Sequence, residues 1–218
     1  MELLLPIISI IILLFSSILH EVMHGFVAYR LGDPTAKVLG RITLDPRPHI
    51  DPFMSILVPI LVYITSAGSF IFGGAKPVPV DPFNLKDGIK DLALVSLAGP
   101  MTNVMLAVVF SISTHFAFPD MSFYAIQNSG LLGFIMTTFI NWNLLLAILN
   151  LMPIPPLDGS KIFAMLLPEK TAAAYLALGN GGLGLMILFA LFFIPIGGFT
   201  LSDVILTLMN ASRTLLGF

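Results

Sequence analysis

Residues 13–32 read LLFSSILHEVMHGFVAYRLG, and this stretch decides how the start of the chain folds. It lies in an apolar run that begins at Leu3 and has no charged residue before Glu21. About 20 apolar residues in a helix are enough to cross ~30 Å of hydrocarbon. A Gly-Asp-Pro sequence at 32–34 then ends the helix. We therefore expect a membrane helix over about 3–29 that carries two histidines and a glutamate.

The composition is typical of a membrane protein. Of the 218 residues, 57% are hydrophobic and only 10% are charged, whereas a soluble domain has roughly 45–50% apolar and about 25% charged residues. The chain has too few charges to cover a surface that faces water. A net charge of -2 without a basic cluster argues against a nucleic-acid partner. The absence of cysteine excludes disulfides, thiolate catalysis and zinc sites built from cysteine.

Further apolar runs follow the first helix. They cover residues 53–72, 92–118, 131–151, 183–195 and 199–216. Together with the first run they predict an all-α polytopic membrane protein with about five to six membrane helices. We expect a single membrane-embedded domain over residues 1–218. Its core, at about 1–165, holds the polar motifs, and its C-terminal helices lie at about 170–218.

Several segments between these runs do not fit a helix. KVLGRITLD, residues 37–45, alternates partly as a strand does and predicts a membrane-associated β-like segment. The proline-rich segments at 46–52, 73–82 and 153–156 are expected to be extended. Backbone without helix is tolerated at membrane depth only when it is buried in protein or lines a wet cavity. We therefore predict re-entrant loops around such a cavity.

The basic residues predict how the helices are oriented. Four of the ten Lys and Arg residues follow the first helix closely, whereas the loop at 119–130 has none. Because cytoplasmic loops are enriched in Lys and Arg, the first helix is expected to run from outside to the cytoplasm. A full crossing by 53–72 would place Lys76, Lys86 and Lys90 outside. We therefore favour a hairpin at 53–72, with a full crossing as the alternative.

His20, Glu21 and His24 form the pattern H-E-x-x-H within the first helix. Residues four apart on a helix lie on nearly the same face, about 6 Å apart along the axis, so the two imidazoles can bind one zinc ion. Glu21 projects about 100° away and is placed to act on water at the metal. The alternative is a polar trio that is satisfied between helices without metal. Ionisable groups in a membrane cost ~2.5–3.5 kcal/mol and usually serve a function, which favours the metal site.

A catalytic zinc site usually has three protein ligands and one open position, so a third ligand is needed. Asp158, in NLMPIPPLDGSK, is the leading candidate, because the preceding prolines extend the chain and can fold the carboxylate back toward the first helix. His49 is the rival. On local propensity alone, the favoured interpretation of Asp158 is a helix N-cap or turn residue before Gly159.

Three motifs in this order resemble the site-2 protease family of intramembrane zinc metalloproteases. They are HEVMH at 20–24, LAGPMTN at 97–103 and NLMPIPPLDG at 150–159. GRITLDPRPHIDP at 40–52 and GGAKPVPV at 73–80 resemble the compact prokaryotic branch without PDZ or CBS domains. The pairing of H-E-x-x-H with the downstream LDG is specific, whereas AGPxxN alone is weak.

The resemblance implies roles for particular residues. It assigns one Zn²⁺ ion to His20, His24 and Asp158, and it makes Glu21 the catalytic acid and base. It implicates Asn150 in holding the substrate carbonyl. It also marks Asn103 and His49 as possible accessory residues, and it does not assign a role to His49.

The resemblance also implies an activity and a location. We expect a metalloprotease that cleaves transmembrane protein or peptide substrates within the lipid bilayer, as in regulated intramembrane proteolysis. The expected location is the cytoplasmic membrane of a prokaryote, as a multi-pass protein with its active site toward the cytoplasm. The alternatives are a catalytically silent metal-binding scaffold and a small transporter. No sequence feature indicates an oligomeric state.

Overall fold

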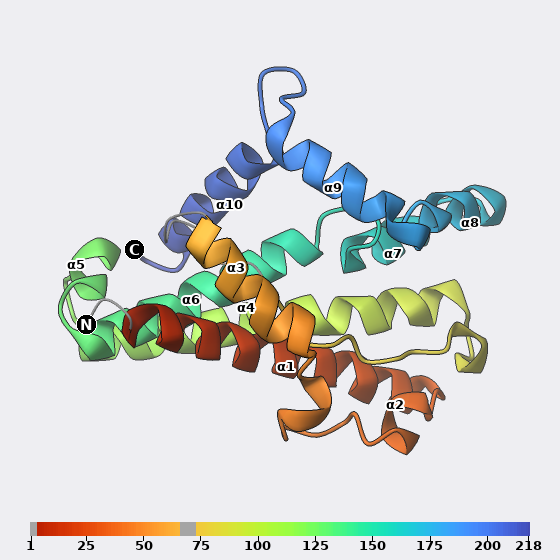
Figure 1. Cartoon of the computed structure of the whole chain (residues 1–218), viewed down its shortest axis with the longest axis horizontal. Helices are drawn as coiled ribbons and strands as arrows, with labels where there is room; N and C mark the ends of the chain where they lie inside the picture. The colour runs from red at the N-terminus through yellow and green to blue at the C-terminus, as the bar shows by residue number, and fades with distance from the viewer. Residues whose placement is uncertain (1–3, 66–72) are drawn as a thin grey trace.

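The computed structural model describes residues 4–65 and 73–218, and its framework is a layer of three long helices (Figure 1). These are α1 (Leu4–Leu31), α4 (Ile89–Ala117) and α6 (Leu131–Asn150). α4 packs against both others and runs in the opposite direction to them (Figure 1). Each of the three is long and apolar enough to cross a membrane, which identifies the chain as a membrane protein.

The remaining helices are shorter. They are α2 (Thr35–Val38), α3 (Val58–Thr65), α5 (Phe123–Gln127), α7 (Asp158–Ala164), α8 (Glu169–Ala177), α9 (Leu183–Phe193) and α10 (Leu201–Leu215). A π-helical turn at Pro52–Leu57 precedes α3, and 3₁₀ turns lie at Arg47–His49, Pro82–Asn84 and Asn180–Gly182. An apolar core between α4, α6, α9 and α10 includes Ala107, Leu144, Leu188 and Ile205.

The prediction of five to six membrane helices is not confirmed, because the described residues contain three helices of sufficient length. The expected runs at 183–195 and 199–216 form helices of 11 and 15 residues. At 1.5 Å per residue both are shorter than ~30 Å of hydrocarbon. Gly197 and Gly198 have positive φ and form a tight turn between them, in which Ile196 and Phe199 pair their backbones.

The predicted β-like segment at 37–45 is wrong. Thr35–Val38 is a helix, and residues 39–44 form turns and bends without a strand. The backbone N–H of Arg41 donates to the carbonyl oxygen of Ala36 at 2.8 Å, and Gly40 has a φ of 65°. This is the local hydrogen bonding of a helix C-terminus, and it occupies donors that a strand would need for pairing. Periodicity in the sequence does not reveal this competition.

The residues on either side of the expected hairpin at 53–72 lie close together. Ser55 Oγ donates to the carbonyl oxygen of Gly74 at 2.7 Å, and the N–H of Lys76 donates to the carbonyl of His49, also at 2.7 Å. Two ends that lie side by side fit the hairpin and not a single full crossing. Residues 66–72 of the expected hairpin lie outside the described residues.

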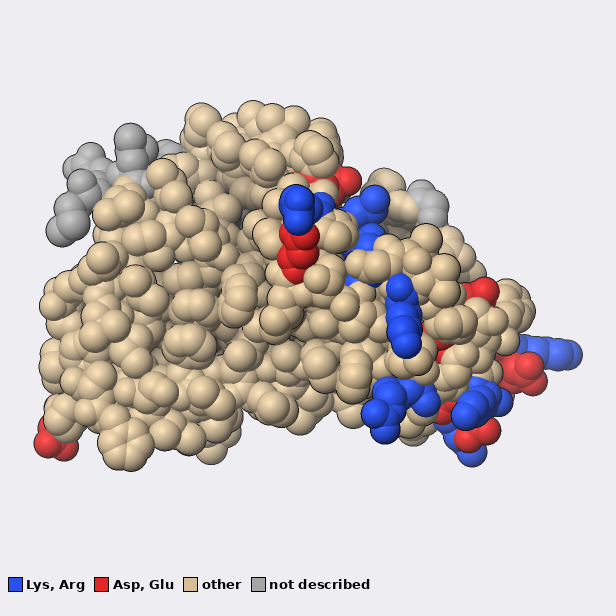
Figure 2. Space-filling model, turned by 90° about the horizontal axis from the view of Figure 1, so that it is seen from below, with Lys and Arg blue, Asp and Glu red and all other residues tan. Residues whose placement is uncertain are grey.

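Charged side chains gather at one end of the molecule. Figure 2 shows the face seen from below in Figure 1. Lys, Arg, Asp and Glu cluster on the part of this face where α2 and the start of α4 lie, and the rest of the face is almost free of them. Both the C-terminal end of α1 and the N-terminal end of α4 lie here (Figure 1). This grouping agrees with the pattern of basic residues in the sequence.

Asp33 anchors the end of α1 to the segment that leads into α4. Its buried carboxylate accepts hydrogen bonds from Thr35, from the N–H of Asp81 at 2.8 Å and from Asn84 Nδ2 at 3.1 Å. Burial raises the pKa of the Asp33 carboxyl, but these hydrogen bonds outweigh burial and hold that pKa below its usual value. The stabilisation is therefore present above the unfolded carboxyl's pKa of ~3.9 and is lost as the pH falls through the folded value.

Replacing Asp33 with Ala is expected to lower the free energy of unfolding by about 1–3 kcal/mol, because the hydrogen bonds that Thr35, Asp81 and Asn84 donate to the buried carboxylate are lost. Chemical denaturation of the purified protein in detergent, followed by circular dichroism, measures this loss. The matched control is Asp45→Ala, which breaks an exposed ion pair with Arg47 and should cost little. Equal losses in the two variants would contradict the anchoring role of Asp33.

Candidate metal centre

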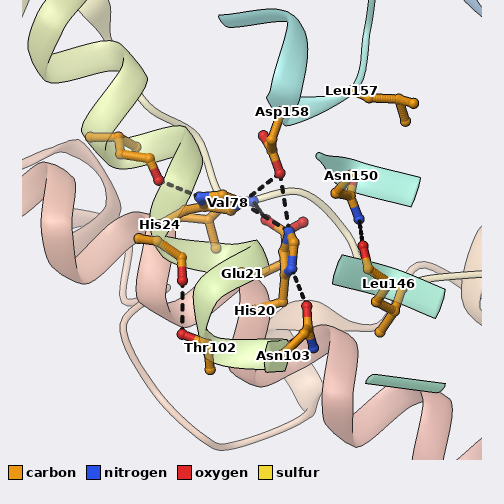
Figure 3. Close-up of polar contacts among 12 residues, drawn as sticks. His20, Glu21, His24, Val78, Thr102, Asn103, Leu146, Asn150, Leu157 and Asp158 are labelled. Atoms are coloured by element: carbon orange, nitrogen blue, oxygen red, sulfur yellow. Dashed lines mark hydrogen bonds and ion pairs between the residues drawn. The ribbon is translucent and has the colours of Figure 1, made fainter. Parts of the chain in front are cut away.

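His20, His24 and Asp158 converge on one point between α1 and α7 (Figure 3). One ligand atom from each lies within 4.8 Å of the others. The two Nε2 atoms are 2.9 Å apart, and Asp158 Oδ2 lies 3.2 Å from that of His20 and 3.0 Å from that of His24. All three side chains are buried. The structure therefore brings together the pair expected from the H-E-x-x-H spacing and the distant carboxylate.

Asp158 reaches this point because the chain after α6 turns back sharply. Asp158 is the first residue of α7, and Leu157 before it is extended. A Cβ atom on Gly159 would overlap the carbonyl oxygen of Leu151, so only glycine allows this close return. Lys161 Nζ donates to Asp158 Oδ1 at 3.1 Å, which leaves Oδ2 to face the imidazoles.

The protonation of the two rings makes this cluster suited to a cation. His24 Nδ1 lies 2.6 Å from the carbonyl oxygen of Val95, and His20 Nδ1 lies 2.6 Å from Asn103 Oδ1. Because both partners are acceptors, each Nδ1 carries the proton, and each Nε2 of a neutral ring presents a lone pair. Two lone pairs and a carboxylate oxygen then face one another, which is repulsive unless a proton or a metal cation lies among them. Two imidazole nitrogens and one carboxylate oxygen are a donor set that zinc accepts.

A chain of hydrogen bonds determines which atom of Asn103 faces His20. Asn143 donates from Nδ2 to the carbonyl oxygen of Phe139 and to Ser16 Oγ, each at 2.9 Å. Since a carbonyl oxygen only accepts, Asn143 Oδ1 faces Asn103, whose Nδ2 donates to it at 2.8 Å. Asn103 therefore presents its own Oδ1 to His20. The backbone carbonyl of Phe139 on α6 thus sets the tautomer of His20 on α1.

Gly99 provides the space beside the two imidazoles. A Cβ atom at this position would lie 2.5 Å from Nε2 of His20 and 2.5 Å from Nε2 of His24. Neither ring can move away freely, because each is held at Nδ1. A glycine on the facing surface of α4 is therefore required for the two rings to approach one another.

Glu21 lies beside the cluster and contacts the extended segment after the hairpin (Figure 3). Its Oε2 accepts a hydrogen bond from the N–H of Val78 at 2.7 Å. Arg41 holds the same segment, because its Nη2 donates to the carbonyl oxygens of Lys76 at 2.8 Å and Pro77 at 3.2 Å. Residues 73–81 have neither helix nor strand, as their prolines predict, and the N–H of Val78 in this segment reaches the carboxylate of Glu21. The expectation of extended backbone is wrong at 46–52, because Arg47–His49 forms a 3₁₀ turn.

His49 and Asn150 are not part of the three-residue cluster. His49 is fully buried, with its Nε2 2.9 Å from the carbonyl oxygen of Thr43. Burial lowers the pKa of His49, which favours a neutral ring. The structure therefore brings Asp158, and not the rival His49, to the histidine pair. Asn150, at the end of α6, donates from Nδ2 to the carbonyl oxygen of Leu146 at 3.0 Å.

Sequence reasoning missed Gly99 and Asn143, although both carry a signal. Gly99 lies four residues before Asn103, and Asn143 lies seven residues before Asn150, so each shares a helix face with a residue that the motifs had singled out. The pairing of Asn143 with Asn103 could not be read from spacing, because it joins two different helices.

The fold and the site together define a membrane protein with a buried candidate zinc centre. Comparison with curated proteins agrees with this class. The chain is 36% identical over 206 residues to "Putative zinc metalloprotease YwhC" of Bacillus subtilis, a match that covers 94% of this chain and 86% of YwhC. The chain therefore belongs to the same family as YwhC.

Two further relatives carry the same kind of name. "Putative zinc metalloprotease Rip2" of Mycobacterium tuberculosis is 36% identical over 146 residues, which cover 67% of this chain and 52% of Rip2. "Putative zinc metalloprotease MJ0611" of Methanocaldococcus jannaschii is 31% identical over 156 residues, which cover 72% of this chain and 69% of MJ0611. No protein-family model and no solved structure matches the chain.

Replacing Gly99 with Ala is expected to reduce zinc affinity about tenfold or more. The added Cβ atom would clash with both Nε2 atoms, and such overpacking costs ~1–3 kcal/mol. Competition with a zinc chelator, followed by elemental analysis of the purified protein, measures the change. Gly74→Ala is the matched control, since a Cβ atom there meets nothing within 4 Å. Wild-type zinc affinity in Gly99→Ala would show that the rings are not confined as described.

Replacing Asn143 with Leu, a side chain of similar size, is expected to lower zinc affinity about 10- to 100-fold, as loss of an outer-shell partner does elsewhere. The physical reason is that Asn103 is no longer held with its Oδ1 toward His20. Thr137→Val is the control on the same helix, because the buried Thr137 hydroxyl bonds only to carbonyls of its own helix. The same chelator competition measures the two zinc affinities. An equal loss in Asn143→Leu and Thr137→Val would argue against the chain of hydrogen bonds from Asn143 through Asn103 to His20.

Proposed function

We propose that this chain is an intramembrane zinc endopeptidase of the site-2 protease type. It hydrolyses peptide bonds in or near transmembrane segments of membrane-protein or peptide substrates, as in regulated intramembrane proteolysis. The observation that carries the proposal is the convergence of His20, His24 and Asp158 within 4.8 Å, with Glu21 adjacent in the same helix. The family's zinc metalloprotease names support the same reaction.

Glu21 is the proposed general base and acid. Bound zinc supplies Lewis-acid polarisation of a carbonyl and makes water more acidic. Val78 occupies Glu21 Oε2, and Oε1 has no hydrogen-bond partner within the described part of the chain. Oε1 is thus available to take a proton from the attacking water and to deliver it to the leaving amine.

Asn150 is the proposed donor to the substrate carbonyl. One N–H of its amide bonds to the carbonyl of Leu146, which orients the side chain and leaves the second N–H for substrate. Loss of one such donor costs about 2.7–4 kcal/mol of transition-state stabilisation in a well-studied protease. Asn103 acts through His20 and is therefore a positioning residue.

The proposed location is the cytoplasmic membrane of a prokaryote, as a multi-pass protein with the site toward the cytoplasm. The basic residues that follow α1 support this orientation, since Lys and Arg concentrate on the cytoplasmic side. His20 and His24 lie in the C-terminal half of α1, toward that charged end. The bacterial and archaeal sources of the relatives support a prokaryotic membrane.

Replacing Glu21 with Gln is expected to reduce cleavage by about 10²–10⁴-fold while zinc binding is retained, because the amide cannot accept the proton. Proteomics of membranes that contain wild type or Glu21→Gln identifies fragments that end in or near transmembrane segments. Glu169→Gln, an exposed glutamate on α8, is the control and should cleave as wild type does.

Two results would overturn the proposal. Zinc bound at one ion per chain without any fragment specific to wild type would indicate a silent scaffold. Fragments that persist in a zinc-loaded Glu21→Gln preparation would show that Glu21 is not the base. Elemental analysis of both preparations makes the two results distinguishable.

A further inference from the structure

Arg213 is set apart from the other basic residues of the chain. Nine of the ten Lys and Arg residues lie between 30 and 170, and Arg213 is the tenth. It belongs to the last turn of α10, which lies beside α5 at the end of the molecule opposite α2 (Figure 1). The metal centre and the charged end of the molecule therefore do not explain this cation.

The guanidinium of Arg213 is held by neutral groups. Asn141 Oδ1 accepts from Nε at 3.1 Å and from Nη2 at 2.9 Å, and Asn210 Oδ1 accepts from Nη1 at 3.0 Å. The ring of Phe123 lies 5.1 Å from the guanidinium carbon. Over residues 4–65 and 73–218, no carboxylate forms an ion pair with Arg213. The group is thus oriented, but its charge is not neutralised.

A pocket of about 330 Å³ opens at this guanidinium. Arg213, Asn141, Asn210 and Gln127 contribute polar groups to its wall, and Phe123 and Phe218 contribute rings. Because both asparagines turn their oxygens to Arg213, their NH₂ groups are left as donors. Neither NH₂ group has a hydrogen-bond partner among the residues that the structure describes. A pocket lined by a fixed cation and free donors is suited to an anion with several oxygens.

The surroundings of the pocket select an amphiphilic anion. Leu215, next to Thr214 of the pocket wall, is 88% exposed, and Phe116 at the end of α4 is 85% exposed. Such large exposed apolar side chains suit acyl chains and not water. Tyr124 of the pocket wall is also exposed, as is typical of aromatic residues at the membrane interface.

The geometry points to a binding site for the phosphate group of an anionic phospholipid at Arg213. The planar guanidinium and the two amide NH₂ groups bind the phosphate oxygens, and the acyl chains run along the apolar surface of α10 and α4. Basic pockets between membrane helices bind phospholipid head groups in this way. The site lies apart from the metal centre, so its occupation does not depend on the proposed peptidase activity.

Native mass spectrometry of the purified chain in detergent with added phosphatidylglycerol tests this site. Wild type is expected to retain one phosphatidylglycerol, and Arg213→Gln should reduce the bound fraction about fivefold or more. Arg213→Lys should give an intermediate fraction, because it keeps the charge without the planar fork. Lys170→Gln, on α8 and not among the residues that line the pocket, is the matched control and should retain lipid as wild type does.

Two further measurements identify the source of the phosphate and show whether the variants are folded. Millimolar inorganic phosphate should not displace the lipid, and full displacement would identify free phosphate as the ligand and overturn the proposal. Equal retention in wild type and Arg213→Gln would also overturn it. Zinc content shows whether each variant is folded. If Arg213→Gln loses zinc, the decisive measurement is lipid retention in Arg213→Lys. Retention in Arg213→Lys equal to that of wild type would count against the site.

Discussion

Three electron-rich atoms face one another inside this protein, and most of its buried polar contacts hold them there. The Nε2 atoms of His20 and His24 and the Oδ2 atom of Asp158 lie within 3.2 Å of their neighbours. These atoms repel one another unless a proton or a metal cation lies among them, so the residues around the cluster must hold it in place against that repulsion. The Nδ1 contacts and the space left by Gly99 provide that resistance.

This constraint explains why fully buried polar side chains occur where the helices are most apolar. A polar group without a partner in such surroundings costs several kcal/mol. Asn103, Asn143 and Ser16 avoid that cost by bonding to one another and to a backbone carbonyl. The same contacts join α1, α4 and α6, so the interactions that orient His20 also hold the three long helices in register.

The polar chemistry of the molecule is divided between its two ends. The charged end carries the anchored loops around Asp33 and Arg41, and the metal centre lies toward it. The opposite end has one guanidinium in a pocket with neutral partners. In a membrane protein this division is physically reasonable, because charged groups are costly within the hydrocarbon and concentrate where water and lipid head groups lie.

The sequence by itself determined the long apolar helices, the histidine pair with Glu21, and a choice of two third ligands. These follow from helix periodicity and apolar length, which are local properties. Tertiary structure decided which side chains meet across the fold: Asp158, and not His49, lies beside the histidine pair, and Asn143 pairs with Asn103. It also replaced the expected strand at 37–45 with turns, because the backbone donors there bond locally. The 183–195 and 199–216 runs, which the turn at Gly197 and Gly198 separates, form helices of 11 and 15 residues that are shorter than ~30 Å of hydrocarbon. Composition alone does not reveal which apolar runs form helices long enough to cross a membrane.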